Sequence, residues 1–135
     1  MARLIRADVT FQPLWAILAA YLETALETSG AKADWGTEDV YAAALKSEVD
    51  VWALTDEAGI FGGCVTSLNV YPRSKAVDVL LLGTDAHRED GWLECLEQLK
   101  DLACQVGACK ITGTGRPGWA RKLGATERRV FELEV

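Results

Sequence analysis

The segment VDVLLLGTDAHREDGWLECLEQL, residues 77–99, contains an apolar run, a charged loop and the start of an amphipathic pattern. The run at 79–82 is apolar without alternation, which is typical of a strand buried on both faces of a sheet. After the loop, apolar residues recur every three or four positions, which predicts a helix that packs one face against a core and ends near Gly107. The apolar positions of this helix are Trp92, Leu96, Leu99, Ala103 and Val106. A buried strand that leads into such a helix predicts an α/β fold.

The residues before this segment contain two more strand patterns. Residues 51–55 and 60–71 flank a short polar turn and therefore predict a hairpin. Gly62 and Gly63 weaken the second of these strands and indicate a bulge or the close approach of another backbone. With the strand at 76–82, the middle of the chain is expected to hold three consecutive strands.

Two helices are expected between a first strand and this hairpin. Residues 4–9 have a strand pattern, and Thr10 is placed to cap a helix that has Pro13 in its first turn and ends near Gly30. A second helix is expected to begin at Thr37, because the two acidic residues that follow suit the positive end of a helix.

The last third of the chain completes the pattern. Residues 109–112 predict a brief strand, residues 117–123 a short helix, and residues 129–135 a last strand in which apolar residues alternate with two glutamates. The predicted order is β-α-α-β-β-β-α-β-α-β, an α/β domain with a mixed sheet that takes up all of residues 1–135.

The distribution of charge limits the class of partner. The 135 residues carry a formal net charge of −6, with 10 acidic and 4 basic side chains in residues 1–70 and 10 of each in residues 71–135. An acidic surface repels a phosphate backbone, so a nucleic-acid partner is not expected. The exception is the stretch 116–129, which holds five basic residues against Glu127 alone. This stretch is either an anion-facing surface or a solvated helix face and strand end.

Cysteine and histidine usage argues against a metal centre. The four cysteines form no C-x-x-C pair and His87 is the single histidine, so no metal site is expected. Cys95 and Cys104 lie nine positions apart, on opposite faces of the expected helix, and all four cysteines are expected to be small, reduced core residues. No apolar stretch approaches the ~20 residues that span a bilayer, and the first residues lack the apolar region of a signal peptide. A cytoplasmic location without membrane contact is therefore expected.

Two loops lead from a strand into a helix, where unpaired N–H groups favour anions. The loop GTGRPG at 113–118 contains the pattern G-x-G-x-x-G, but only 17 residues follow it, too few for the rest of a dinucleotide-binding unit. It is either a flexible turn or, through Arg116, an anion contact. The loop at 83–92 has Arg88 and Gly91 at its helix end, beside three acidic residues that would cap the helix and compete with a phosphate: Asp85, Glu89 and Asp90.

The element order over nearly all 135 residues resembles that of the GNAT (Gcn5-related N-acetyltransferase) superfamily. The turn VYPR at 70–73 and the loop GRPGW at 115–119 are together similar to the small GNAT-like proteins of tailed bacteriophages. The resemblance implies that the end of the central strand, at Leu82 and Gly83, binds the pantetheine arm of acetyl-CoA through its backbone. Arg88 and Gly91 match the first two marked positions of the loop R/Q-x-x-G-x-G/A, which wraps the pyrophosphate in the superfamily.

The chain departs from the superfamily at two positions. Leu93 stands where the loop pattern has Gly or Ala, and a side chain of that size would crowd the approach of a pyrophosphate. Ala120 stands where many members have the tyrosine that protonates the departing CoA thiolate, and alanine cannot donate a proton. No residue qualifies as catalytic, although Glu57, Asp78 and His87 have the right chemical type for a general base.

These departures predict a protein with little or no catalysis, and the resemblance to the phage proteins implies a role in virion assembly or in other protein–protein contacts, self-association included. Acetyl-CoA is compatible with this prediction and not required by it. The alternative is an acetyl-CoA-dependent N-acetyltransferase that acts on a small amine or a protein amine. The expected location is the host cytoplasm, with or without incorporation into the virion. The two hypotheses differ on whether the strands that end at Leu82 and begin at Cys109 diverge, since a closed gap would exclude the pantetheine arm.

Overall fold

The computed structural model of the chain describes residues 1–115 and 118–135. Its strands are β1 (Arg3–Arg6), β2 (Asp50–Asp56), β3 (Gly59–Val70), β4 (Lys75–Thr84) and β5 (Lys110–Gly113). Its helices are α1 (Gln12–Ser29), the 3₁₀ turn η1 (Ala31–Ala33), α2 (Thr37–Leu45), α3 (Glu89–Gln105) and α4 (Trp119–Leu123). The predicted order of elements is therefore confirmed as far as α4.

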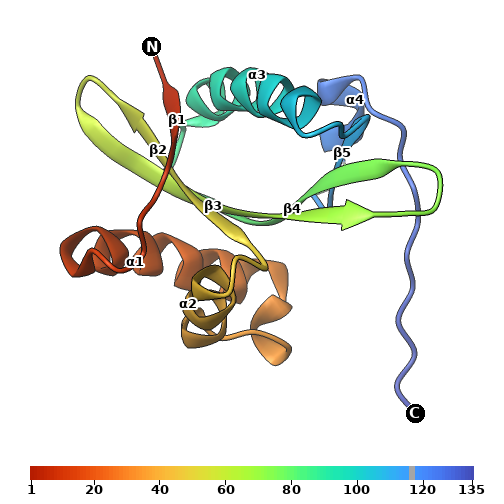
Figure 1. Ribbon diagram of the computed structural model, residues 1–135, viewed down its shortest axis with the longest axis horizontal. Helices are drawn as coiled ribbons and strands as arrows, with labels where there is room; N and C mark the ends of the chain where they lie inside the picture. The colour runs from red at the N-terminus through yellow and green to blue at the C-terminus, as the bar shows by residue number, and fades with distance from the viewer. Residues whose placement is uncertain (116–117) are drawn as a thin grey trace.

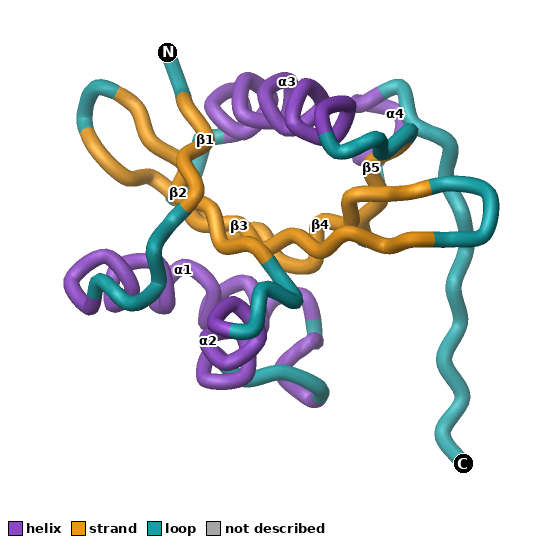
Figure 2. The backbone as a smooth tube through the Cα atoms, in the orientation of Figure 1, coloured by secondary structure: helices purple, strands orange, loops and turns teal. Residues whose placement is uncertain are grey.

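The strands form one mixed sheet in the order β1-β2-β3-β4-β5. Neighbours pair antiparallel from β1 to β4. Strands β4 and β5 pair parallel, because α3 carries the chain back to the end of the sheet where β4 begins. Helices α1 and α2 cover one face and α3 covers the other (Figures 1 and 2). The prediction of an α/β fold with a mixed sheet is confirmed.

Each face of the sheet has its own hydrophobic core. Under α1 and α2, fully buried leucines at 18, 22 and 26 pack on strand residues that include Val51, Val65 and Leu81. Under α3, the core is built from Leu96, Leu99 and other residues around Phe61. The two helix patterns read from the sequence thus correspond to the two cores.

The starts of α1 and α2 show one wrong and one correct prediction. Thr10 does not cap α1; its backbone N–H and hydroxyl both donate to a carboxylate oxygen of Asp8, at 3.0 and 2.6 Å, and Phe11 occupies the cap position. Thr10 thus donates to Asp8 in an Asx-turn arrangement, and its hydroxyl oxygen accepts no N–H of α1, which begins one residue later than predicted. Helix α2 begins at Thr37 as predicted, and the N–H of Gly36 donates to Asp39 at 2.9 Å.

Two β-bulges distort the centre of the sheet. Phe61 is the extra residue in β3 where its register with β2 shifts, and Leu80 is the extra residue in β4 where its register with β3 shifts. A Cβ at Gly62 would lie 2.6 Å from the carbonyl oxygen of Gly83. The prediction of a bulge or a close backbone approach is therefore confirmed at Gly62, whereas Gly63 makes only ordinary contacts with α1.

The apolar run at 79–82 is less buried than predicted. Leu81 is buried, Val79 and Leu82 are half-buried, and Leu80 is 38% exposed. The bulge explains the difference, because an extra residue shifts the alternation of side chains and points one leucine away from both cores.

The strand predicted at 129–135 is absent. These residues are extended but unpaired, and they leave the body of the molecule after α4 (Figure 1). The alternation of apolar and acidic residues gives them strand character, but a strand also requires a hydrogen-bonded neighbour, and the described residues provide none.

Exposure also corrects the prediction for two cysteines. Cys64 and Cys95 are buried, while Cys104 and Cys109 are exposed, and all four are free thiols. The opposite placement of Cys95 and Cys104 on α3 is confirmed. Among the described residues, no helix is both long and apolar enough to cross a membrane.

Candidate functional site

The parallel pairing of β4 and β5 is short, and the point where it ends is named the divergence of the two strands. Residues 76–79 pair with residues 110–113, after which β5 ends while β4 continues to Thr84. The bulge at Leu80 lies at this point of divergence. Beyond Val79, no strand within the described residues pairs with the edge of β4 that faces β5. Such an edge presents backbone N–H and C=O groups to a ligand.

Leu82 and Gly83, both predicted to contact a cofactor, lie on this unpaired part of β4. Leu82 is half-buried and packs in the core under α3. Gly83 is buried against α1, since a Cβ there would collide with the carbonyl oxygen of Tyr21. Packing occupies the side-chain positions of both residues, so any contact with a ligand would be made through the backbone.

Arg88, the first residue of the predicted pyrophosphate loop, is held by two side chains from the β2–β3 hairpin. Its guanidinium lies 4.0 Å from the centre of the Phe61 ring and forms an ion pair with Asp56. The carboxylate also accepts the backbone N–H of Ala58 at 2.8 Å. The hydrogen bond from Arg88, followed by the backbone bonds, holds the pKa of Asp56 below its ordinary value. The charge of Arg88 is therefore already neutralised within the fold.

Gly91, the second residue of the predicted loop, is needed for packing. A Cβ at this position would lie 2.7 Å from Cζ of Phe61, which is only 2% exposed, and 3.4 Å from a guanidinium nitrogen of Arg88. Leu93, two positions along, is half-buried. The glycine that matches the superfamily pattern is thus explained by Phe61 without any ligand.

A second contact joins α1 to the loop that follows β4. The hydroxyl of Tyr21 donates to a carboxylate oxygen of Asp85 at 3.0 Å, and the N–H of Asp85 donates to the carbonyl of Phe61 at 2.8 Å. Burial, reinforced by the bond to Asp85, raises the pKa of Tyr21 above its ordinary value. This contact fixes the loop, and no sequence pattern pointed to it because its two residues lie far apart in the chain.

Helix α4 is connected to the first turn of α3. Nζ of Lys122 lies 2.5 Å from a carboxylate oxygen of Glu89 and 5.1 Å from the centre of the Trp119 ring, which packs in the core under α3. Ala120 lies in the same short helix and has no proton to donate. The five-residue α4 is therefore anchored beside the predicted pyrophosphate loop.

The three side chains considered as general bases lie in different places. Asp78 is on β4, two residues before the bulge, and accepts the hydroxyl proton of Thr112 on β5 at 2.6 Å. Glu57 is 2.5 Å from the amino group of Met1, and His87 sits in the loop before α3 with φ of 60°. Of the three, only Asp78 lies next to the point where β4 and β5 diverge.

The remaining predicted site residue, Arg116, lies outside the described residues. Within the described residues, no group of three or more His, Cys, Asp or Glu side chains is arranged to hold a metal ion. Burial raises the pKa of Cys64 to about 12 and that of Cys95 to about 11, so neither buried thiol is a nucleophile at neutral pH.

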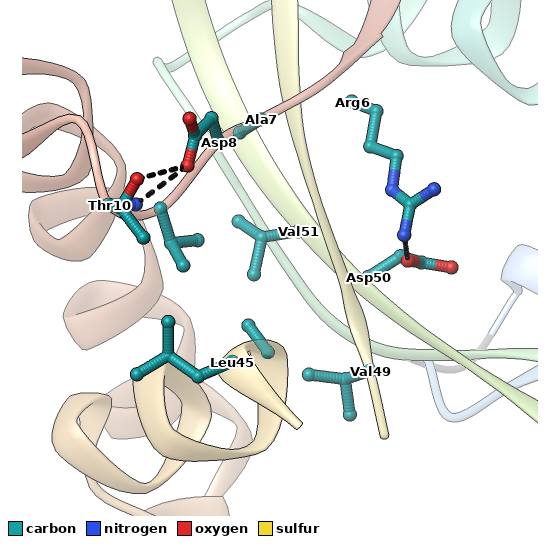
Figure 3. A pocket seen from close by; sticks show the side chains of 10 residues that line it. Arg6, Ala7, Asp8, Thr10, Leu45, Val49, Asp50 and Val51 are labelled. Atoms are coloured by element: carbon teal, nitrogen blue, oxygen red, sulfur yellow. Dashed lines mark hydrogen bonds and ion pairs between the residues drawn. The ribbon is translucent and has the colours of Figure 1, made fainter. Parts of the chain in front are cut away.

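Two surface pockets lie away from the β4–β5 divergence, and no sequence pattern pointed to either of them. The first, about 190 Å³, lies between the β1–α1 loop, the end of α2 and the start of β2, where Arg6 pairs with Asp50 at 2.6 Å (Figure 3). The second, about 380 Å³, lies between the end of α1 and the start of α2. Its wall contains Lys32, Trp35 and four carboxylates, from Glu23, Asp34, Glu38 and Asp39.

Comparison with known proteins establishes the fold. Neither a protein-family profile nor a curated protein matches the sequence. A predicted acetyltransferase from Clostridium acetobutylicum, solved with acetyl-CoA, superimposes with a TM-score of 0.73 at 14% identity, over 99% of this chain and 96% of that one. The fold is GNAT-like. A probable acetyltransferase gives 0.72 at 12% identity, over 98% and 95% of the two chains.

An aminoglycoside acetyltransferase from an uncultured soil metagenomic sample gives a TM-score of 0.71 at 17% identity, over 100% of this chain and 99% of that one. The similarity covers nearly the whole of each protein, so the GNAT-like fold extends over the full chain. At these identities the likeness concerns the backbone. The activity of this GNAT-like protein must be argued from its own residues.

Proposed function

We propose that this protein binds acetyl-CoA along the unpaired edge of β4 and transfers the acetyl group to an amine. The observation that carries the proposal is the edge of β4 beyond Val79, which no described strand covers because β5 ends at Gly113. A pantetheine arm contains two amide groups, and these can pair with a free strand edge as an added strand would. The backbone of residues 80–84 supplies that edge, with Leu82 and Gly83 in its middle.

The first turn of α3 would face the pyrophosphate. Its N–H groups and the positive end of the helix attract an anion, but Glu89 and Asp90 lie in the same turn. Arg88 is paired with Asp56, and Lys122 is paired with Glu89. The pantetheine arm therefore has a free strand edge to pair with, whereas the pyrophosphate would face two carboxylates and two cations that are already paired. We expect the nucleotide end to bind weakly.

Acetyl-CoA supplies an acetyl group activated as a thioester. The amine gains the acetyl group and loses one proton, and the CoA sulfur leaves with the electron pair of the carbon–sulfur bond. Asp78 is the group we propose as proton acceptor, because it lies beside the divergence and Thr112 fixes its carboxylate. Thiols have a pKa of about 8.5, so a CoA thiolate can leave without the acid that Ala120 lacks, although more slowly.

Amide hydrogen exchange with and without acetyl-CoA tests the binding site. The proposal predicts slower exchange for residues 80–84, and also when S-acetylpantetheine, which lacks the nucleotide, replaces acetyl-CoA. Residues 12–29 of α1 serve as the internal control. Unchanged exchange at residues 80–84, together with no thermal shift at millimolar acetyl-CoA, would exclude the proposed site.

Release of free CoA in the presence of pooled amines tests the reaction. The variant Asp78→Asn should lower kcat by about a hundredfold or more while leaving the dissociation constant of acetyl-CoA unchanged. Asp78→Glu should restore part of the rate and keep the pH profile. A loss of binding and rate together in Asp78→Asn would mean that Asp78 has a structural role instead.

A second candidate is a non-catalytic interaction module, of the kind that takes part in virion assembly. It is favoured by Ala120, which cannot act as an acid, and by the pairing of Arg88 with Asp56 inside the fold. This candidate predicts neither protection of residues 80–84 by acetyl-CoA nor release of CoA with any amine. The two experiments above therefore separate the candidates.

A further inference from the structure

The two edges of the sheet are protected to different degrees. At β1, α3 reaches over the free edge: Gln98 accepts the N–H of Leu4 and donates to the carbonyl of Ala2, both at 2.8 Å, and Glu94 accepts the N–H of Ala2 at 3.0 Å. At β5, residues 110–113 pair with β4 on one side, and no described residue bonds to the backbone on the other side. An open strand edge of this kind pairs readily with another strand.

The C-terminal arm, defined as residues 129–135, has strand character and no partner. The side chains of Val130, Phe131, Leu133 and Val135 are all more than three-quarters exposed, at 92, 91, 79 and 125%. Four large apolar side chains in seven residues are unusual on a solvated segment. The arm runs away from the body of the molecule and does not return to β5 (Figure 1).

We propose that the arm of one copy adds as a strand to the β5 edge of a second copy, with the arms exchanged reciprocally in a two-fold dimer. Exchange of identical segments closes the assembly, because each copy gives one arm and receives one. One contact then supplies hydrogen-bond partners to the backbone of both the arm and the β5 edge. This inference does not depend on acetyl-CoA binding.

The two faces of β5 match the two faces of the arm. Ile111 packs on the core under α3, while Lys110 and Thr112 point to the other face, where the Lys110 ammonium lies 5.5 Å from the centre of the Tyr71 ring. In the arm, Phe131, Leu133 and Val135 share one face and two glutamates share the other. With the apolar face placed beside Ile111, the glutamates lie on the same side as Lys110 and complement its charge.

The joint between α4 and the arm allows such an exchange. Gly124 ends α4 with φ of 66°, a left-handed conformation that glycine adopts without strain. The four residues that follow, 125–128, belong to no helix or strand and are exposed, and they separate the arm from α4. A hinge of this kind permits the arm to reach a neighbouring molecule.

Sedimentation equilibrium of the full chain tests the proposal. We expect a mass of about twice 14.7 kDa at micromolar concentration. The double variant Phe131→Ser with Leu133→Ser should be a folded monomer, since these side chains lie outside both cores. As a control, Ile17→Ser with Leu45→Ser removes two apolar side chains on α1 and α2 that are 47 and 53% exposed, and this variant should remain a dimer.

Charge reversal and amide exchange complete the test. Lys110→Glu should weaken the dimer about tenfold or more, and adding Glu132→Lys with Glu134→Lys should restore it. In the dimer, the amides of the arm should exchange slowly. A monomeric wild-type chain would overturn the proposal. If its arm amides were protected, the arm would lie on its own β5; if they were unprotected, the arm would have no partner strand. A dimer that survives the arm substitutions would place the interface elsewhere and overturn it too.

Discussion

The guanidinium of Arg88 lies 4.0 Å from the centre of the Phe61 ring, at the start of α3. Phe61 is the extra residue of the β3 bulge, and Gly91 packs against the edge of the same ring. The bulge, the arginine and the glycine therefore form one packing unit that fixes where α3 begins. Arg88 and Gly91, which match a pyrophosphate loop, therefore have a structural role in this chain that does not require a bound cofactor.

Substitution of Gly91 tests that packing unit. Gly91→Ala should destabilise the protein by about 1–2 kcal/mol, because overpacking a core costs about 1–3 kcal/mol and the gain in helix propensity offsets less than about 1 kcal/mol. The free energy of unfolding in urea measures the change. In a Phe61→Leu background the same substitution should cost less, because the smaller side chain leaves room for the new methyl group. Equal costs in the two backgrounds would contradict the contact.

The Asp56–Arg88 pair predicts a pH-dependent stability difference. Because the folded-state pKa of Asp56 lies below its unfolded value, the pair contributes stability that is fully present above about pH 4 and is lost as pH falls through the lowered pKa. Asp56→Asn should therefore lower the Tm at pH 7 and match the wild type near pH 2. Glu48→Gln, at an exposed loop position, is the control. A difference in Tm that stays constant from pH 7 to pH 2 would argue against the pair.

The sequence predicted the elements that are fixed by local periodicity. Local patterns predicted the helices α1 and α3, the turn between β2 and β3 and the irregularity at Gly62, and each of these predictions was confirmed. The two cores follow from these patterns, because each amphipathic helix has one face to bury.

What the sequence could not predict depends on partners far along the chain. Asp56 and Arg88 are 32 positions apart, and their pairing follows from the hairpin geometry and not from any local motif. The alternation at 129–135 indicated a strand correctly as a propensity, but a propensity does not provide a neighbouring strand. Thr10 does not cap α1, because its hydroxyl donates to Asp8 and the helix begins after Phe11.

The four thiols should fall into two classes. A colourless disulfide reagent that reports released thiolate should react quickly with Cys104 and Cys109, which are exposed, and slowly with Cys64 and Cys95, whose pKa values burial raises to about 12 and about 11. We therefore expect two fast equivalents in native buffer and four in denaturant. Fast reaction of all four thiols under native conditions would show that the core under α3 opens readily.

Removal of one carboxylate beside α3 should strengthen acetyl-CoA binding. Glu89→Gln removes a negative charge from the first turn of the helix and releases Lys122 from its ion pair. We expect the dissociation constant to fall about two- to fivefold, which corresponds to the roughly 0.3–1 kcal/mol that one charge contributes at a helix end. Calorimetric titration measures it, with Glu97→Gln on the same helix as the matched control. Unchanged affinity in Glu89→Gln would place the pyrophosphate away from this turn.

Ala120 offers the sharpest test of whether the missing acid limits the reaction. If acetyl transfer occurs at the β4 edge, Ala120→Tyr places a phenol on α4, in the position where the superfamily resemblance implies an acid. CoA release should then rise about tenfold or more, since a well-placed general acid typically contributes about 10²–10⁴-fold. Ala120→Phe has the same bulk without the hydroxyl and should show no increase. A gain of equal size in both variants would reflect packing against Trp119 and not proton donation, and no gain in either would mean that departure of the CoA thiolate does not limit the rate.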